Sequence, residues 1–368
     1  MGIFRHGYAV RSVAGFFHLA ALSTALAFSV AATPALAQVE TNVPTPVPGA
    51  QPVTVERTKV HSEAIAGDLE GNSADRDVIV FLPPSYGKGP ARRYPVVYAL
   101  HGYSIGAEQW TSEIRVPQTI EGAFALGANE MIVVLPDSKT VHAGSMYSSS
   151  PTTGDFETFV SRELVAYIDS HYRTIADREA RGLVGHSMGG YGATRIGLKH
   201  ADIFGALYLM SPCCYTRDLA NYPPDIESAV ATIKTPADSA SLPFGIRAML
   251  ATSSAWSPNP KNPPLYLDLP VKDGKVRPDI MAKWQANSVL NFVDQYIGNL
   301  RRYAAIATDV GDQDGLKVDA EKLHKVLNDY GIANSFEIYP GTHTSEIANR
   351  FQSHVLPFFS KHLRASDR

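Results

Sequence analysis

Short apolar runs alternate along this chain with segments whose apolar residues recur at helical spacing. The apolar runs predict strands at residues 77–82, 94–100, 131–135, 182–184, 204–210, 303–308 and 335–339. The periodic segments predict helices at residues 117–128, 156–172, 193–198, 318–330 and 344–363, and rough alternation at 53–65 predicts an early antiparallel strand. Buried strands that alternate with helices are typical of an α/β fold, with a mostly parallel central sheet and helices on both faces.

Two stretches break this alternation. Residues 137–155 are rich in Ser, Thr, Gly and Tyr and predict a long loop, and residues 213–300 contain five prolines between 258 and 270 and only short helical pieces such as 279–286. We expect the second stretch to be an insertion over the C-terminal edge of the sheet, before the strand at 303–308. The insertion and the long loop should together build a pocket, within a single domain that spans residues 54–368.

The first 37 residues have the pattern of a secretory signal peptide. Arg5 and Arg11 give a positive start, residues 14–32 are apolar, and Pro34 is followed by Ala-Leu-Ala at 35–37. The alternative is an uncleaved membrane anchor, because the apolar run is nearly long enough to span a bilayer. Residues 38–53, rich in Pro and polar residues, predict a flexible linker. We therefore expect a periplasmic or secreted protein with no stable membrane insertion after cleavage.

Composition excludes some classes of partner. The chain has 368 residues, of which 45% are hydrophobic and 19% charged, and its net charge is −3. Loss of Arg5 and Arg11 would make the net charge −5 (−3 − 2), which argues against a nucleic-acid partner. Cys213 and Cys214 are adjacent, and two free buried thiols are at least as favoured as a strained pairing between them. No cluster has the spacing of a metal site, and we expect no metal and no cofactor.

The candidate chemistry begins at Gly185-His186-Ser187-Met188-Gly189. This spacing, between an apolar run and a periodic segment, is typical of a nucleophile elbow, in which a serine is held in front of a helix N-terminus. The Met188 N–H would then point at a developing oxyanion. The alternative is a glycine-rich turn whose serine only caps the helix.

An activated serine needs a base and an orienting acid, each following a strand later in the chain. His343 follows the last predicted strand, and a surface or capping role is its alternative; His324, His354 and His362 are expected to be structural. For the acid, Asp314 is favoured over Asp312 and Asp309.

The second oxyanion donor should come from the loop after an earlier strand. Tyr103 follows His101-Gly102 at the end of the most apolar strand, and Gly102 would allow close approach to the substrate. His101 and His186 are expected to be structural rather than second bases.

These residues resemble the "putative esterase" branch of the α/β-hydrolases, which includes feruloyl and acetyl-xylan esterases, enterochelin-type esterases, S-formylglutathione hydrolases and the antigen 85 mycolyltransferases. The similar pieces, spread over about residues 75–363, are Leu100-His101-Gly102 with Trp110, the segments 167–169 and 172–174, the elbow through Ala193, Gly311 with Asp314, and Gly341 with His343. The resemblance implies an α/β-hydrolase fold, a Ser187–Asp314–His343 triad and an oxyanion hole from Met188 and Tyr103. One departure is Thr344-Ser345-Glu346, where many relatives have an aromatic residue soon after the histidine.

The sequence thus predicts an exported serine esterase that hydrolyses a carboxylic ester through an acyl-enzyme on Ser187. The alternatives are an acyltransferase to a sugar hydroxyl and a non-catalytic binding protein on the same fold. The substrate is expected to be a small-molecule or carbohydrate-linked ester. Tyr147, Trp256 and Trp284 are candidate stacking surfaces, with packing in the core or lid as their alternative.

Overall fold

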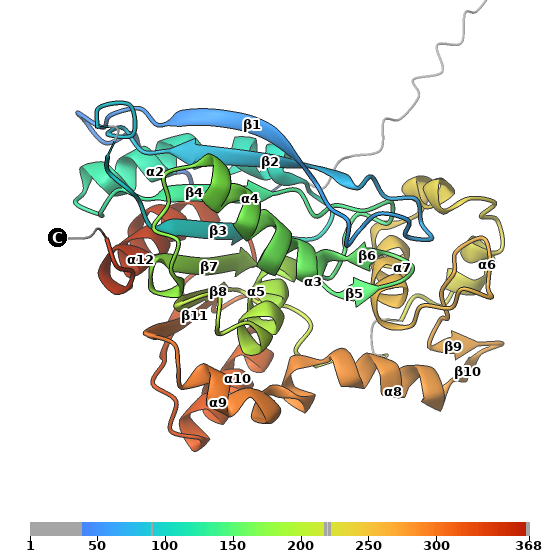
Figure 1. Cartoon of the computed structure of the whole chain (residues 1–368). Helices are drawn as coiled ribbons and strands as arrows, with labels where there is room; N and C mark the ends of the chain where they lie inside the picture. The colour runs from blue at the N-terminus through green and yellow to red at the C-terminus, as the bar shows by residue number, and fades with distance from the viewer. Residues whose placement is uncertain (1–38, 90, 217–218, 220–221, 366–368) are drawn as a thin grey trace, which may run out of the picture. The chain divides into compact units, whose positions relative to one another are not determined.

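A computed structural model describes residues 39–365 except 90, 217–218 and 220–221, and the predicted signal peptide lies outside these residues. Within the described part of the chain, eight strands form one sheet in the order β1-β2-β4-β3-β7-β8-β11-β12. The strands are β1 (Thr54–His61), β2 (Asp75–Leu82), β3 (Val96–Leu100), β4 (Ile132–Pro136), β7 (Arg181–His186), β8 (Ala206–Met210), β11 (Ala305–Gly311) and β12 (Ser335–Tyr339). They cross the domain side by side (Figure 1).

The six strands from β4 to β12 are parallel to one another, whereas β2, near one edge, is antiparallel to both of its neighbours, β1 and β4. The predicted α/β class with a mostly parallel sheet is therefore confirmed. Because the strands are parallel, the loops that follow β3, β7, β11 and β12 all leave the same edge of the sheet. The predicted nucleophile, acid and base all lie in these loops.

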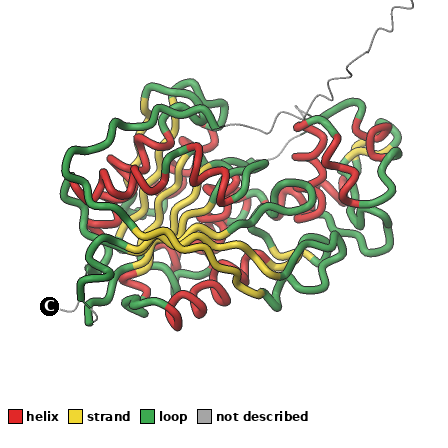
Figure 2. The backbone as a smooth tube through the Cα atoms, turned by 90° about the horizontal axis from the view of Figure 1, so that it is seen from above, coloured by secondary structure: helices red, strands yellow, loops and turns green. Residues whose placement is uncertain are grey.

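Alternate residues of each strand face two separate cores. In β3, for example, Val96 and Tyr98 pack in one core and Val97 and Ala99 in the other. Helices cover both faces (Figure 2). The first face is covered by α4 (Leu164–His171), α5 (Met188–Lys199), α9 (Ile297–Leu300) and α10 (Lys317–Asp329), and the second by α1 (Ala107–Glu113), α2 (Val116–Ala125), α11 (Ile347–Arg350) and α12 (Leu356–His362). The predicted helices at 117–128 and 318–330 are close to α2 and α10.

Two predicted helices contain a π-helical turn. The helix expected at 156–172 runs as α3 (Phe156–Thr158), a π-turn at Phe159–Glu163, and α4. The last helix likewise contains a π-turn at Phe351–Val355 between α11 and α12. Helical periodicity detects such segments as single helices, because one wider turn hardly changes the apolar pattern.

The stretch between β8 and β11 contains α6 (Ile226–Val230), α7 (Phe244–Trp256), α8 (Pro278–Asn287), α9 and a small hairpin of β9 (Val271–Lys272) and β10 (Lys275–Val276). The long loop holds a second hairpin, β5 (Ser149–Ser150) and β6 (Gly154–Asp155), which lies beside α7 (Figure 1). The expected strand at 303–308 is longer than predicted, because β11 continues to Gly311.

Cys213 and Cys214 form a disulfide with each other, which is one of the two alternatives that the sequence left open. The loop accommodates this pairing because Cys214 adopts a left-handed backbone conformation with φ of 67°. The Cys213 N–H donates to the Ser187 carbonyl at 3.1 Å, which places the cysteine pair directly behind the predicted nucleophile.

Residues 39–53, here called the strap, have no helix or strand of their own but contact the domain along their length. The Val39 N–H donates to Glu113 at 2.9 Å, the Gln118 side chain donates to the Pro44 carbonyl at 2.6 Å, and the Val53 N–H donates to Glu121 at 3.0 Å. The flexibility predicted for this segment stays a prediction. In the part of the chain that the structure describes, no helix is both long and apolar enough to cross a membrane.

Candidate active site

Ser187 lies in a sharp turn between β7 and α5. Its backbone has φ of 57° and ψ of −115°, which is a strained conformation for a residue with a side chain. A Cβ on Gly185 would lie 2.0 Å from the Gly189 carbonyl oxygen, and one on Gly189 would lie 2.0 Å from the Leu100 oxygen. Only glycine fits at both positions, so the glycine spacing is a packing requirement of this elbow. The Ser187 side chain makes no cap hydrogen bond to α5, which removes the capping alternative.

The structure brings the predicted nucleophile, base and acid into one hydrogen-bonded chain. His343 Nε2 lies 2.9 Å from Ser187 Oγ, and His343 Nδ1 lies 2.8 Å from Asp314 Oδ2. Asp314 follows β11 and His343 follows β12, so both arrive from the edge of the sheet where β7 ends. The carboxylate accepts the Nδ1 proton, which leaves Nε2 free to accept the proton of the serine hydroxyl.

Asp314 is held as a carboxylate. Burial raises the pKa of Asp314, but the hydrogen bond from His343 and further donors outweigh burial, and the pKa is lowered from its ordinary value. One of these donors is the Leu316 N–H at 2.9 Å. The side chain is 2% exposed, so it contacts the histidine in a largely water-free site.

The two other candidate acids have different partners. Asp309 is buried within β11, where its Oδ2 accepts hydrogen bonds from Tyr208 and Arg350, both at 2.8 Å. Asp312 accepts a hydrogen bond from the Gly341 N–H at 2.9 Å and so fastens the loop that precedes His343.

The two neighbouring histidines hold backbone in place. Burial lowers the pKa of His186 to about 3, and its Nε2–H donates to the His343 carbonyl at 2.9 Å. His101 donates from Nδ1 to the Gly102 carbonyl and accepts from the Ser138 N–H at Nε2, each at 2.8 Å. Both nitrogens of the His101 ring are therefore occupied, and Nε2 of His186 contacts backbone rather than Ser187.

The predicted oxyanion donors flank the serine. Met188 is the first residue of α5, so its N–H has no acceptor within the helix. A Cβ on Gly102 would lie 3.5 Å from Ser187 Cβ, which places the backbone around Tyr103 against the nucleophile. The Tyr103 hydroxyl donates to the His142 carbonyl at 3.0 Å and thereby ties this loop to residues 137–155.

A buried acid–imidazole pair lies behind this loop. Glu70 Oε1 is 3.5 Å from His142 Nε2, and both side chains are fully buried. Burial raises the pKa of Glu70 to about 7 and lowers that of His142 to about 3, so both are neutral in mild acid. His142 Nδ1 also pairs with the Ser239 hydroxyl of the insertion at 2.7 Å. The pair therefore joins the long loop to the insertion.

Ser187 lines a hollow of about 180 Å³. Its lining is largely apolar: Val39, Gly102, Tyr103, Ser104, Ile105, His186, Ser187, Phe244, His343 and Thr344. Phe244 begins α7 and meets Tyr103 edge to face at 5.2 Å between ring centroids. The insertion thus contributes a wall, and Gly102 lies in the lining as predicted.

Tyr147 and Trp284, predicted to bind substrate, do not line this hollow. The Tyr147 side chain is fully buried, packs against Gly192 and donates to the His101 carbonyl at 3.0 Å. Trp284 is 1% exposed and packs edge to face against Trp256 with 6.0 Å between ring centroids. Both predictions are wrong, because rings buried this deeply support the walls and cannot touch a ligand.

Three apolar lining residues were missed from the sequence. Val39 lies in a stretch with the composition of a linker, Ile105 lies in a short loop, and Phe244 begins a helix in a region without clear periodicity. The only available signal was an apolar side chain next to a predicted loop, which does not separate a pocket wall from a packed core.

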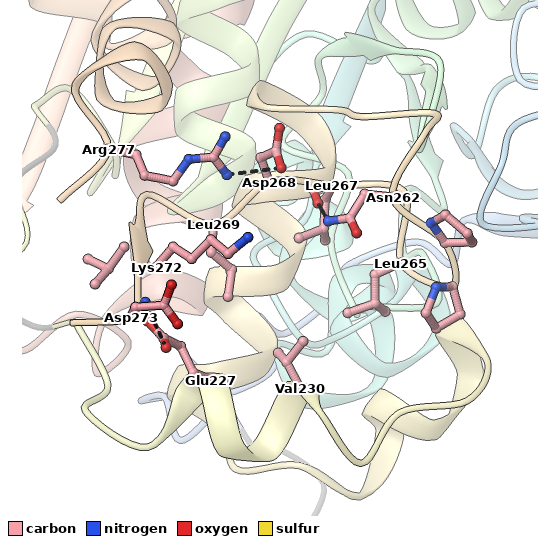
Figure 3. A pocket seen from close by; sticks show the side chains of 13 residues that line it. Glu227, Val230, Asn262, Leu265, Leu267, Asp268, Leu269, Lys272, Asp273 and Arg277 are labelled. Carbon is pink, nitrogen blue, oxygen red and sulfur yellow. Dashed lines mark hydrogen bonds and ion pairs between the residues drawn. The ribbon is translucent and has the colours of Figure 1, made fainter. Parts of the chain in front are cut away.

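A larger hollow of about 320 Å³ lies within the insertion (Figure 3). It contains the Arg277–Asp268 ion pair at 3.0 Å and Glu227, which accepts from the Asp273 N–H at 3.0 Å. None of its lining residues borders the hollow at Ser187, and it holds no nucleophile paired with a base. Among the described residues, no group of three or more His, Cys, Asp or Glu side chains is placed to hold a metal ion.

Comparison with protein families identifies the family of this chain. A family model described as "Putative esterase" matches residues 72–356. The chain belongs to this esterase family. The match includes the elbow, Asp314 and His343, and it confirms the predicted resemblance.

Curated relatives match only a part of the chain. An endo-1,4-beta-xylanase/feruloyl esterase of Xylanibacter ruminicola is 31% identical over 140 residues, 37% of this chain and 19% of that protein. An acetyl esterase of Caldicellulosiruptor saccharolyticus is 28% identical over 137 residues, 37% of this chain and 48% of that protein. The similarity thus covers 19% and 48% of these two relatives' own length.

Solved structures extend the likeness to most of the chain. A ferulic acid esterase has a TM-score of 0.59 at 23% identity, and covers 85% of this chain and 99% of its own. An S-formylglutathione hydrolase from Staphylococcus aureus has a TM-score of 0.55 at 14% identity, with 85% and 99% covered. These likenesses show the fold, which is the predicted α/β-hydrolase fold.

Proposed function

We propose that this chain is an exported serine esterase that hydrolyses carboxylic esters through an acyl-enzyme on Ser187. The observation that carries the proposal is the hydrogen-bonded chain from Ser187 through His343 to Asp314, with separations of 2.9 and 2.8 Å. A serine esterase of the triad type uses this order of nucleophile, base and orienting acid. Membership of the esterase family supports the same reading.

In the proposed reaction, His343 Nε2 takes the proton of the Ser187 hydroxyl as Oγ attacks the ester carbonyl carbon. The N–H groups of Met188 and Tyr103 stabilise the negative oxygen of the tetrahedral intermediate. The imidazolium then gives its proton to the departing alcohol, and the acyl group stays on Ser187. A water molecule, deprotonated by His343, releases the acid and restores the serine. Asp314 stabilises the positive imidazole in both steps.

The hollow supports an ester with a compact, apolar group. Its volume of about 180 Å³ and its valine, isoleucine, tyrosine and phenylalanine walls favour short aliphatic or single-ring substituents over long chains or charged groups. Feruloyl and acetyl esterases among the relatives make both kinds of acyl group candidates for this chain.

The test is hydrolysis of p-nitrophenyl esters from acetate to octanoate, and of methyl ferulate, by three proteins. Wild type and the control Ser170→Ala, which changes an exposed serine on α4, should hydrolyse the same esters. Ser187→Ala should be slower by several orders of magnitude. Wild-type-like hydrolysis by Ser187→Ala would refute the proposal. Product analysis with added sugars separates hydrolysis from acyl transfer, since a transferase would yield acylated sugar.

Export is tested separately. Expression of the full chain in a bacterial host, followed by fractionation, should give a periplasmic or secreted protein. Its mass should be that of a chain that begins at Gln38. A protein of full-length mass in the membrane fraction would instead support the anchor.

A further inference from the structure

We infer that Val39, at the start of the strap, is a specificity-determining wall of the ester-binding hollow. This inference rests on the proposed function, since it concerns which esters fit beside Ser187. Val39 lines the same hollow as Ser187, His343 and Thr344, although it precedes Ser187 by nearly 150 residues. The side chain is apolar, as are its neighbours Ile105 and Phe244.

Val39 is held in place from the side of α1. Its N–H donates to Glu113 Oε2 at 2.9 Å. The other carboxylate oxygen of Glu113 accepts from the Gln109 side chain at 2.8 Å, which orients the acceptor. The Val39 side chain packs against the core on the α1 and α2 face of the sheet. A valine fixed by both backbone and side chain can act as a rigid wall.

The next residues of the strap fasten to the loop after His343. The Asn42 N–H donates to the Ser345 carbonyl at 2.6 Å. The Thr41 hydroxyl donates to the same carbonyl at 3.3 Å and accepts from the Ala348 N–H at 3.2 Å. The Asn42 side chain also donates to Glu346. The strap therefore crosses from α1 to the histidine loop and closes one side of the hollow.

This arrangement makes a directional prediction about substrate size. Shortening Val39 to alanine removes two methyl groups from the wall and gives a longer apolar group room and contact. Each methylene that gains or loses burial changes affinity by about fourfold, so the preference for a longer over a shorter ester should rise about tenfold. A larger side chain should reverse the effect by occupying the hollow.

The experiment compares wild type, Val39→Ala, Val39→Phe and the control Val43→Ala. Val43 is also partly buried in the strap and packs on the same core, but it does not line the hollow. For each protein, kcat/KM is measured for p-nitrophenyl esters from acetate to octanoate, and for acetate esters of methanol to hexanol. The two series separate a wall on the acyl side from one on the alcohol side, and thermal unfolding of each variant checks that it is folded.

The expected result is a rise of about tenfold in the ratio of long-chain to short-chain kcat/KM for Val39→Ala in one of the two series. Val39→Phe should lower that ratio, and Val43→Ala should leave it within twofold of wild type. If the folded Val39 variants change kcat/KM by the same factor for every ester, or do not change it, the inference is overturned while the esterase proposal stays intact. If wild type hydrolyses none of the esters, that result would instead contradict the proposed function.

Discussion

The replacement Asp314→Asn tests whether this side chain orients the catalytic base. Asp314 Oδ2 accepts the Nδ1 proton of His343 at 2.8 Å, and an asparagine that presents its NH2 group there would force the proton of neutral His343 to Nε2. Nε2 then faces the Ser187 hydroxyl, 2.9 Å away, as a donor and can no longer accept its proton. The carboxylate charge that would stabilise the imidazolium is lost as well.

These two losses set the magnitude. The same change in a serine protease triad lowers kcat by about 10⁴-fold with its geometry intact. Here too the carboxylate is buried, and it contacts His343 at 2.8 Å, so we expect a fall of about 10³- to 10⁴-fold in kcat, or about 4–5 kcal/mol in activation free energy. Folding should change little, because asparagine has the same shape.

The assay is the steady-state hydrolysis of p-nitrophenyl acetate by wild type, Asp314→Asn and the control Asp312→Asn. Asp312 lies two residues away and accepts a hydrogen bond from Gly341 N–H, which asparagine can also accept through its carbonyl oxygen. The control should stay within tenfold of wild type. A value for Asp314→Asn within tenfold of wild type, or an equal loss in both variants, would refute the assignment of the acid.

Three further predictions concern stability. Glu70 has a pKa of about 7 in the folded state and 4.5 in the unfolded state, so between these pH values only the folded state keeps the proton. As the pH rises from 4.5 to above 7, the free energy of unfolding of wild type, measured with urea, should fall by about 3 kcal/mol relative to that of Glu70→Gln, and an equal pH dependence of the two proteins would contradict the burial argument. Asp309→Asn should lower the free energy of unfolding by about 3 kcal/mol, because it removes the charge from a buried ion pair, and should change kcat/KM by less than tenfold. A large kinetic loss with unchanged stability would return Asp309 to the candidate acids. Gly185→Ala should destabilise by about 3 kcal/mol or more because its Cβ meets backbone at 2.0 Å, whereas Gly315→Ala, which meets nothing within 4 Å, should be neutral within 0.5 kcal/mol in the same thermal unfolding assay.

Local sequence patterns were enough to predict the strands of the central sheet, most of the helices that cover it, and the elbow. The Gly185 and Gly189 spacing reports a backbone contact that any sequence with this turn must satisfy. His343 could be predicted from its place after the last strand, because parallel strands bring their carboxyl ends to one edge. These features depend on residues close together in the chain or on a topological rule.

The sequence favoured Asp314 among the three candidate acids, but it did not predict the roles that Asp309 and Asp312 have instead. β11 runs three residues further than its apolar run, so Asp309 lies within the strand and pairs with Arg350 from the final helical segment. Only the folded chain brings these two residues together. The composition of the strap likewise predicts a linker outside the domain. In the structure Val39 reaches the hollow through a backbone contact that composition does not reveal.

The aromatic predictions failed for a general physical reason. Trp284 lies in the insertion, which lines the hollow through Phe244, but Tyr147 lies in the loop 137–155, which contributes no lining residue, so the prediction that this loop builds the pocket is wrong. Both rings are buried, where their large apolar area stabilises the segments that carry them. Other residues, among them Val39, Ile105 and Phe244, form the surface that a substrate would meet.

The central claim is that Ser187 carries the acyl group. The most direct measurement is intact-mass and peptide analysis of the protein quenched in acid during turnover of a slowly deacylating p-nitrophenyl ester, with wild type and Ser187→Ala side by side. The account predicts a mass gain of one acyl group on wild type, located on the peptide that contains Ser187, and no gain on the variant. Wild type that hydrolyses the ester and is labelled at another residue, or Ser187→Ala that is acylated as fully as wild type, would contradict it.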